Sequence, residues 1–201
     1  MEINPVTLEG RQVRLEPIRL GHAAALWQAG AYEEIWHYMP YAMRSEDDMR
    51  TLIEAELRKQ QAGLTLRFAS IARACEQPIG STSYLNIDQQ HRRLEIGGTW
   101  ITPSWQRSAV NTEAKYLQLS HAFETLGCIR VEFKTDSLNL KSRRALARIG
   151  AIEEGTFRNH MVMPDGRLRH SVYFSIIDSE WPNVKAHLER LMSSYKDEGM
   201  A

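Results

Sequence analysis

The chain has 201 residues, with 25 Lys and Arg against 25 Asp and Glu, and therefore no formal net charge. This length and the 43% hydrophobic content are typical of one compact globular domain, and they exclude a disordered tail, a collagen-like rod and a membrane protein. The balanced charge also argues against a broad nucleic-acid-binding surface, which needs a basic excess. We predict one domain over residues 1–192 and a polar tail over 193–201.

The first residues have neither the basic start nor the apolar stretch of a signal peptide, so we expect a cytoplasmic protein without a membrane partner. Cys75 and Cys128 lie far apart and outside any metal-type spacing, and we expect both to be buried thiols. No two of the seven histidines are four residues apart. We therefore predict no metal site.

The first half of the chain alternates helical and strand-like patterns. Ser45, followed by the acidic residues 46–48, is typical of a helix start, and Gly63 marks the end of that helix. The adjacent Gly97 and Gly98 within a strand-like run predict a bulge or a close approach of a ligand. The expected elements are a strand at 12–16, helices at 20–31 and 45–61, an aromatic loop between these helices, and strands at 66–72, 79–87 and 94–101.

The second half contains a strand between two helices and then a hairpin. The run at 129–134 alternates strictly between apolar and charged residues, which predicts a strand with one buried face. Pro164-Asp165-Gly166 is typical of a hairpin turn. The expected elements are helices at 111–126 and 139–149, strands at 157–163 and 171–177, and a last helix at 180–192. The order indicates a mixed α/β (α+β) fold.

A strand-to-helix junction at 100–114 is the strongest local feature. Its small and polar residues lead into a helix start, where free backbone N–H groups and the helix dipole favour an anion such as phosphate. An ordinary turn capped by Ser108, Asn111 or Thr112 explains the same residues. Sequence alone leaves both interpretations open.

Two further features carry charge. Lys141, Arg144 and Arg148 share one helical face, which is either a solvated surface or a clamp for phosphates. Glu95 points to the opposite side of its strand from Leu94 and Ile96. It is a candidate base if that side is an active cleft, and a surface charge if that side is solvent.

Nearly the whole chain resembles the GNAT superfamily of acyl-CoA-dependent N-acyltransferases, and in particular the branch of ribosomal-protein N-terminal acetyltransferases. The resemblance is carried by an ordered set of motifs: 105–115, Ala122-Phe123-Glu124, Lys134-Thr135-Asp136, Asn139 with Ser142, and Gly150-Ala151 before Glu154-Gly155. It implies a GNAT fold, in which a central, mixed, mostly antiparallel twisted sheet of about seven strands is flanked by helices. The strand ending at Ile101 would splay from the strand at 129–135 and bind acyl-CoA there.

The resemblance also implies site residues. The loop at 106–112 would bind the pyrophosphate of coenzyme A, and Asn139 would bind the pantetheine arm. The basic helix at 139–149 would lie near the phosphates. For the reaction that such a site performs, Glu95 is our candidate base, directly or through water, and backbone N–H groups near 97–100 would stabilise the oxyanion. The expected cofactor-binding residues are Ile101, Gln106, Arg107, Ser108, Ala109, Val110, Asn111, Thr112, Asn139, Ser142 and Arg144.

The sequence departs from the family pattern in two places. Arg107 occupies a frequent glycine position of the loop, so we expect a different loop geometry and an additional phosphate contact. Leu146 occupies the position of a tyrosine that many members use to protonate the departing thiolate. Ser142 is the candidate replacement, and the alternative is a small residue packed against coenzyme A.

The implied reaction is direct transfer of an acetyl group from acetyl-CoA to a primary amine in a ternary complex. Residues 31–60 hold seven acids against four bases, and this local charge of −3 would attract a cationic acceptor, either a peptide or protein N-terminus or a small amine. A non-catalytic acyl-CoA sensor or partner-binding module is the alternative function, and an RNA contact of the basic helix is a third, less favoured interpretation. The sequence does not decide whether the chain forms a homodimer.

Overall fold

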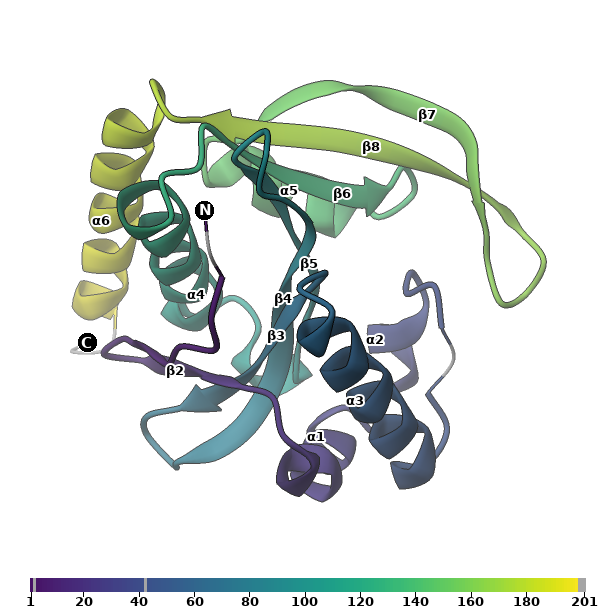
Figure 1. Cartoon of the computed structure of the whole chain (residues 1–201). Helices are drawn as coiled ribbons and strands as arrows, with labels where there is room; N and C mark the ends of the chain where they lie inside the picture. Colours follow the sequence, from purple (N-terminus) through teal and green to yellow (C-terminus); the bar gives the residue numbers. More distant parts are fainter. Residues whose placement is uncertain (2, 42, 199–201) are drawn as a thin grey trace.

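A computed structural model describes residues 1, 3–41 and 43–198 (Figure 1). The strands are β1 (Leu8–Glu9), β2 (Val13–Pro17), β3 (Leu66–Ala72), β4 (Gln77–Asp88), β5 (Arg93–Ile101), β6 (Arg130–Asp136), β7 (Ile152–Val162) and β8 (Leu168–Ile177). The helices are α1 (Ala23–Ala29), α2 (Glu33–Trp36), α3 (Glu46–Gln61), α4 (Ala109–Ser120), α5 (Leu140–Arg148) and α6 (Trp181–Glu198). Short helical turns precede α1 and α4, and a π-helical turn over His121–Thr125 follows α4.

The described strands form one sheet in the order β1-β2-β3-β4-β5-β6-β8-β7. Only β5 and β6 are parallel, and every other neighbouring pair is antiparallel. This confirms the predicted mixed, mostly antiparallel sheet between helices. The sheet has eight strands instead of about seven, because the two-residue β1 is too short to produce a sequence pattern.

Helices cover both faces of the sheet (Figure 1). On one face, α4, α5 and α6 enclose the larger apolar core, which includes Leu94, Ile96 and Phe133. On the other face, α1 and α3 enclose a second cluster around Leu26, Ile53 and Trp100. The alternation along β5 therefore places Leu94 and Ile96 on the α4 side and leaves Glu95 on the α3 side.

The caps of α3 form as the sequence predicts. The Ser45 hydroxyl accepts a hydrogen bond from the Asp48 N–H at 3.1 Å, which satisfies one of the free donors of the first turn. Glu46, Asp47 and Asp48 complement the helix dipole. Gly63 follows with a φ of +71°, a conformation that glycine adopts without steric cost.

Several boundaries and one burial prediction were wrong. The expected loop between the first long helices contains α2, and the helix expected at 20–31 is a 3-10 turn followed by α1. The last helix continues to Glu198, so it extends beyond the expected end at Met192 into the polar segment. Cys75 is exposed in the turn between β3 and β4, whereas Cys128 is buried as expected. Among the described residues, no helix is long and apolar enough to cross a membrane.

Candidate active site

The parallel strands β5 and β6 are paired only at one end. Arg93, Leu94 and Glu95 stand opposite Arg130, Val131 and Glu132. Beyond this point β5 continues along β4 and β6 continues along β8, without pairing to each other. The facing edges of 96–101 and 133–136 therefore keep backbone groups that a ligand can pair with. This is the splayed strand pair that the sequence resemblance implies.

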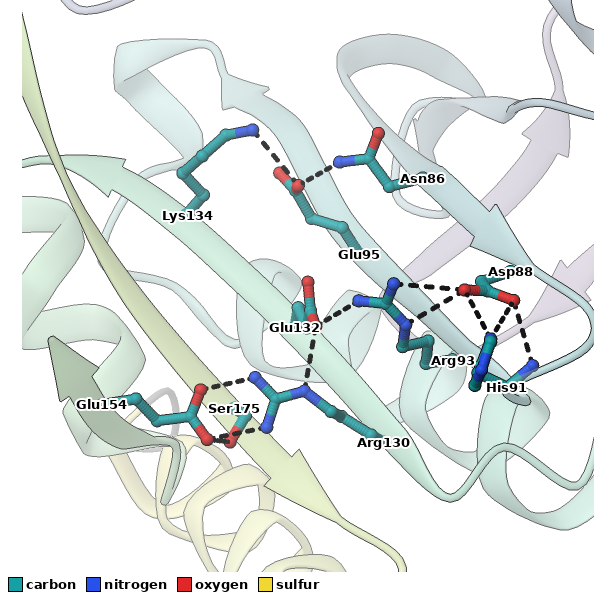
Figure 2. Close-up of polar contacts among 10 residues, drawn as sticks. All are labelled: Asn86, Asp88, His91, Arg93, Glu95, Arg130, Glu132, Lys134, Glu154 and Ser175. Carbon is teal, nitrogen blue, oxygen red and sulfur yellow. Dashed lines mark hydrogen bonds and ion pairs between the residues drawn. The ribbon is translucent and has the colours of Figure 1, made fainter. Parts of the chain in front are cut away.

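A network of charged residues fixes the paired end (Figure 2). Glu132 accepts from Arg93 Nη1 at 3.1 Å and from Arg130 Nε at 2.9 Å. Arg130 also forms a bidentate pair with Glu154, whose pKa is lowered mainly by these hydrogen bonds. The network ties β5, β6 and β7 together at one end, so the separation of β5 and β6 begins at a defined residue.

A bulge in β5 lies just beyond this point. Ser81 pairs with Trp100 and Ser83 pairs with Gly97, so Thr82 opposes both Gly98 and Thr99. Gly98 has a φ of +59°, and a Cβ at this position would lie 2.7 Å from the Arg67 guanidinium. Both the backbone conformation and the space favour glycine here, as the sequence predicts.

Glu95 occupies the corner between the paired strands and the bulge. Its side chain is 3% exposed, accepts a hydrogen bond from Asn86 Nδ2 at 2.8 Å and forms an ion pair with Lys134 Nζ at 3.3 Å (Figure 2). A Cβ on Gly97 would lie 2.8 Å from Glu95 Oε1. The carboxylate thus lies over the glycine backbone where β5 and β6 separate, and not on an open surface.

The loop before α4 presents backbone donors near the other end of the splay. Ser108 is the N-cap, and its hydroxyl accepts from the Val110 N–H at 3.3 Å. The first turn of any helix has free N–H groups, so those of Ala109 and Asn111 can bind an anion. Arg107 has a φ of +61°, so the loop makes a left-handed turn despite the missing glycine. The expected change in geometry is therefore not seen at this residue.

The basic face of α5 lies against this loop. Lys141 Nζ donates a hydrogen bond to Gln106 Oε1, and Arg148 donates to Thr112 Oγ1 at 2.9 Å. Arg144 is exposed on the same helix, while Arg143 pairs with Glu153 at 3.1 Å. The structure thus brings together the phosphate-type loop and the cationic helix, which are about thirty residues apart in the sequence.

Comparison with known proteins identifies this arrangement. The family described as Acetyltransferase (GNAT) domain matches residues 12–152. The chain belongs to the GNAT acetyltransferase family. A Bacillus subtilis relative named "Putative ribosomal N-acetyltransferase YdaF" is 31% identical over 153 residues, which cover 75% of this chain and 80% of that protein.

Solved GNAT structures agree with the fold. A GCN5-related N-acetyltransferase from Brucella melitensis is 30% identical, with a TM-score of 0.89, and the match covers 96% of this chain and 87% of that one. Mycobacterium smegmatis RimJ in complex with CoA-disulfide is 22% identical with a TM-score of 0.78, over 89% and 88% of the two chains, and shows the shared fold alone. This GNAT protein is therefore an acetyltransferase, and acetyl-CoA is the acyl donor of its family.

The remaining predicted residues of the GNAT site fall into two groups. Asn139 caps α5, and its Oδ1 accepts from the Ser142 N–H at 3.0 Å, so both residues sit directly after β6. By contrast, the side chains of Ile101, Val110 and Thr112 are buried in the protein interior. These three residues can contact a ligand in the loop only through their backbone.

The α3 side of the GNAT sheet carries further polar residues, of which sequence reasoning missed Arg67. Arg67 is 4% exposed, donates to Ser83 Oγ at 3.0 Å and lies 4.0 Å from Glu56 Oε2. Tyr38, from the loop after α2, donates to the Leu138 carbonyl at 3.3 Å. This loop therefore reaches the chain just after β6, beside the splay. Among the described residues, no three His, Cys, Asp or Glu side chains are placed to hold a metal ion.

Two buried charged residues of α4 were also missed. Glu113 accepts hydrogen bonds from the N–H groups of Arg11, Gln12 and Val13 at 2.6–2.9 Å, and so anchors the start of β2. Lys115 lies in the interior, and none of the carboxylates in the described part of the chain pairs with it. Both residues fit a regular helical pattern. The one sequence signal that could have identified them is a charged residue on the face of the helix that is otherwise buried.

Proposed function

We propose that this chain transfers an acetyl group from acetyl-CoA directly to a primary amine, with the α-amino group of a peptide or protein as the preferred acceptor. The observation that carries the proposal is the position of Glu95, a buried carboxylate at the residue where β5 and β6 stop pairing. A thioester held between the separated strands would lie beside a base and a bulged backbone. These are the groups that aminolysis needs.

The fit of coenzyme A rests on this chain's own donors. The N–H groups of Ala109 and Asn111 suit a pyrophosphate, since Lys141 contacts Gln106 of the same loop and Arg144 is exposed on the same helix as Lys141. The amide NH₂ of Asn139 suits a pantetheine carbonyl, because its oxygen is already engaged in capping α5. The unpaired edges of 96–101 and 133–136 suit the amide groups of the pantetheine arm.

Glu95 would accept the proton of the incoming amine. At pH 7 a lysine-like amine costs roughly 4.6 kcal/mol to deprotonate, whereas an α-amino group costs only about 1.4 kcal/mol. Lys134 and Asn86 hold the carboxylate in place, so it is oriented before the substrate arrives. A modest base is therefore sufficient for an α-amino acceptor.

The backbone N–H groups near the bulge would stabilise the tetrahedral oxyanion, and Ser142 would protonate the departing thiolate. The Ser142 hydroxyl is half-buried at the start of α5. Leu146, at the position of the usual tyrosine, is buried in the core and has no proton to give. Of Ser142 and Leu146, only the serine has a hydroxyl proton to give to the thiolate.

The acceptor would approach from the side of α2 and α3. Glu33, Glu34, His37 and Tyr38 line a shallow hollow there, and its two carboxylates suit a cationic or basic acceptor. The YdaF relative, with its ribosomal N-acetyltransferase name, supports a protein N-terminus as substrate. An RNA contact is less favoured, since Arg143 and Arg148 of the basic helix are engaged within the chain.

The test compares wild type with Glu95→Gln. We expect the substitution to lower kcat by about 10²-fold or more, as removal of a general base does, and to leave acetyl-CoA affinity unchanged in calorimetry. Arg50→Gln is the matched control, because Arg50 is an exposed residue of α3 that pairs with Glu46 of the same helix. Equal kcat in Glu95→Gln and wild type would remove Glu95 from the mechanism. Acetyl-CoA binding without release of the coenzyme A thiol in the presence of any amine would favour the sensor.

A further inference from the structure

Lys115 is a buried amine that the reaction described above does not use. It lies on α4 and is 5% exposed. Its Nζ lies 2.9 Å from Thr99 Oγ1 and 3.3 Å from both Thr82 Oγ1 and Gln118 Oε1. Within the described chain it has no ion-pair partner, and burial lowers its pKa to about 7. A buried amine without a carboxylate opposes folding, so a purely structural role would be served better by an apolar side chain.

Two of the three partners of Lys115, Thr82 and Thr99, lie at the β5 bulge. At the bulge Thr82 of β4 opposes both Gly98 and Thr99 of β5. The hydroxyls of Thr82 and Thr99 lie 2.7 Å apart, and Lys115 contacts both. A single side chain therefore joins α4 to both strands at the position where their regular pairing is interrupted.

Lys115 is on the opposite side of the sheet from Glu95. Thr82 and Lys115 share Gln118 of α4 as a partner, so this network faces α4. Glu95 faces Asn86 and Lys134 on the α3 side. The amino group thus contacts the bulge from behind, away from the proposed path of the acceptor.

We propose that Lys115 is a positioning residue for acetyl transfer. Its amino group holds Thr82 and Thr99, and this fixes the backbone of Gly97 to Trp100 in the bulged conformation that directs N–H groups at the thioester oxygen. α4 also begins at the loop that is proposed to bind the pyrophosphate. The same helix would therefore position both the pyrophosphate and the thioester of acetyl-CoA. This inference rests on the proposed function for its catalytic consequence, but the contact with the bulge does not depend on the acceptor.

The first experiment needs no substrate. Hydrogen–deuterium exchange is measured on peptides spanning residues 94–101 in wild type, Lys115→Met and Thr99→Val. We expect faster exchange of the bulge in both variants and unchanged exchange in β3 and α6. Lys185→Met is the control, because this residue lies on α6 and pairs with Glu124. If the bulge exchanges at the wild-type rate in a folded Lys115→Met protein, the proposal is wrong.

The second experiment separates positioning from folding. We expect Lys115→Met to lower kcat by at least about tenfold while the KM for acetyl-CoA changes by less than about threefold, because misplaced oxyanion donors affect the transition state more than binding. Lys115→Gln, which keeps a donor, should recover part of this loss, and the double variant with Thr99→Val should be no slower than Lys115→Met. Unchanged kcat in a folded Lys115→Met protein would overturn the proposal.

The proposal stays testable if the Lys115→Met variant is unfolded or if wild type is inactive. If Lys115→Met does not fold, Thr99→Val alone carries both measurements, since it removes one hydroxyl and leaves the lysine. If wild type transfers no acetyl group, the proposed function fails, while the exchange experiment still decides whether Lys115 holds the bulge.

Discussion

Replacement of Lys115 by methionine should change how stability depends on pH. The ordinary pKa of 10.5 falls to about 7 in the folded protein because the amine is buried. This difference of roughly 3.5 units, 10.5 minus 7, corresponds to about 5 kcal/mol at 1.36 kcal/mol per unit. Because the folded state binds the proton more weakly than the unfolded state, protonation opposes folding. The penalty is complete below pH 7 and disappears as the pH rises towards 10.5.

Between pH 7 and pH 9 the lysine should therefore add about 2 kcal/mol to the free energy of unfolding. The assay is urea unfolding of wild type, Lys115→Met and Lys185→Met at both pH values. We expect wild type and Lys185→Met to gain about 2 kcal/mol more than Lys115→Met over this interval, and Lys115→Met to be the most stable of the three at pH 7. In wild type the Thr82 and Thr99 hydroxyls lie 2.7 Å apart, so each has a partner besides the lysine. If wild type and Lys115→Met show parallel pH profiles, the buried amine does not cause this pH dependence.

Three substitutions test other parts of the account. Arg107→Gly should be more stable than Arg107→Ala by about 1 kcal/mol in thermal unfolding, because the φ of +61° disfavours any residue with a Cβ; equal stability would contradict this. Glu113→Gln should lower the free energy of unfolding in urea by about 2–3 kcal/mol. Both carboxylate oxygens accept hydrogen bonds from backbone N–H groups of 11–13, whereas an amide has only one acceptor oxygen. An unchanged unfolding midpoint would show that Glu113 does not anchor the start of β2. Ser142→Ala should lower kcat by about tenfold or more with an unchanged KM for acetyl-CoA, and unchanged turnover would leave Ser142 as a packing residue.

Local signals in the sequence predicted much of the fold. Ser45 with its acidic first turn located α3, and the alternation at 129–134 located β6. The Gly97-Gly98 pair located the bulge, because a φ of +59° strongly favours glycine. These features depend on the backbone conformation of a few consecutive residues, and a single sequence contains that information.

Long-range contacts explain most of what the sequence did not predict. Glu113 acts on backbone groups about a hundred residues away, and Lys115 acts on two strands that no local pattern connects to it. The four residues of α2 are too few for a helical period. The exposure of Cys75 follows from its place in a turn, which composition does not reveal.

The site was predicted in parts. The resemblance to GNAT proteins placed the splay, the loop and the basic helix together, and the geometry of Lys141 and Arg148 agrees with it. It did not distinguish backbone from side-chain roles, because the burial of Val110 and Thr112 depends on how α4 packs. The roles of Glu95 and Ser142 stay predictions.

The most direct test of the central claim is to follow both products of one reaction. Wild type is incubated with acetyl-CoA and two peptides of equal length, one with a free N-terminus and no lysine, the other with a blocked N-terminus and one residue replaced by lysine. We expect one free thiol for each acetyl group found by mass spectrometry on the free α-amine, with far slower transfer to the lysine. Thiol release without acetylated peptide, or faster acetylation of the lysine, would contradict it.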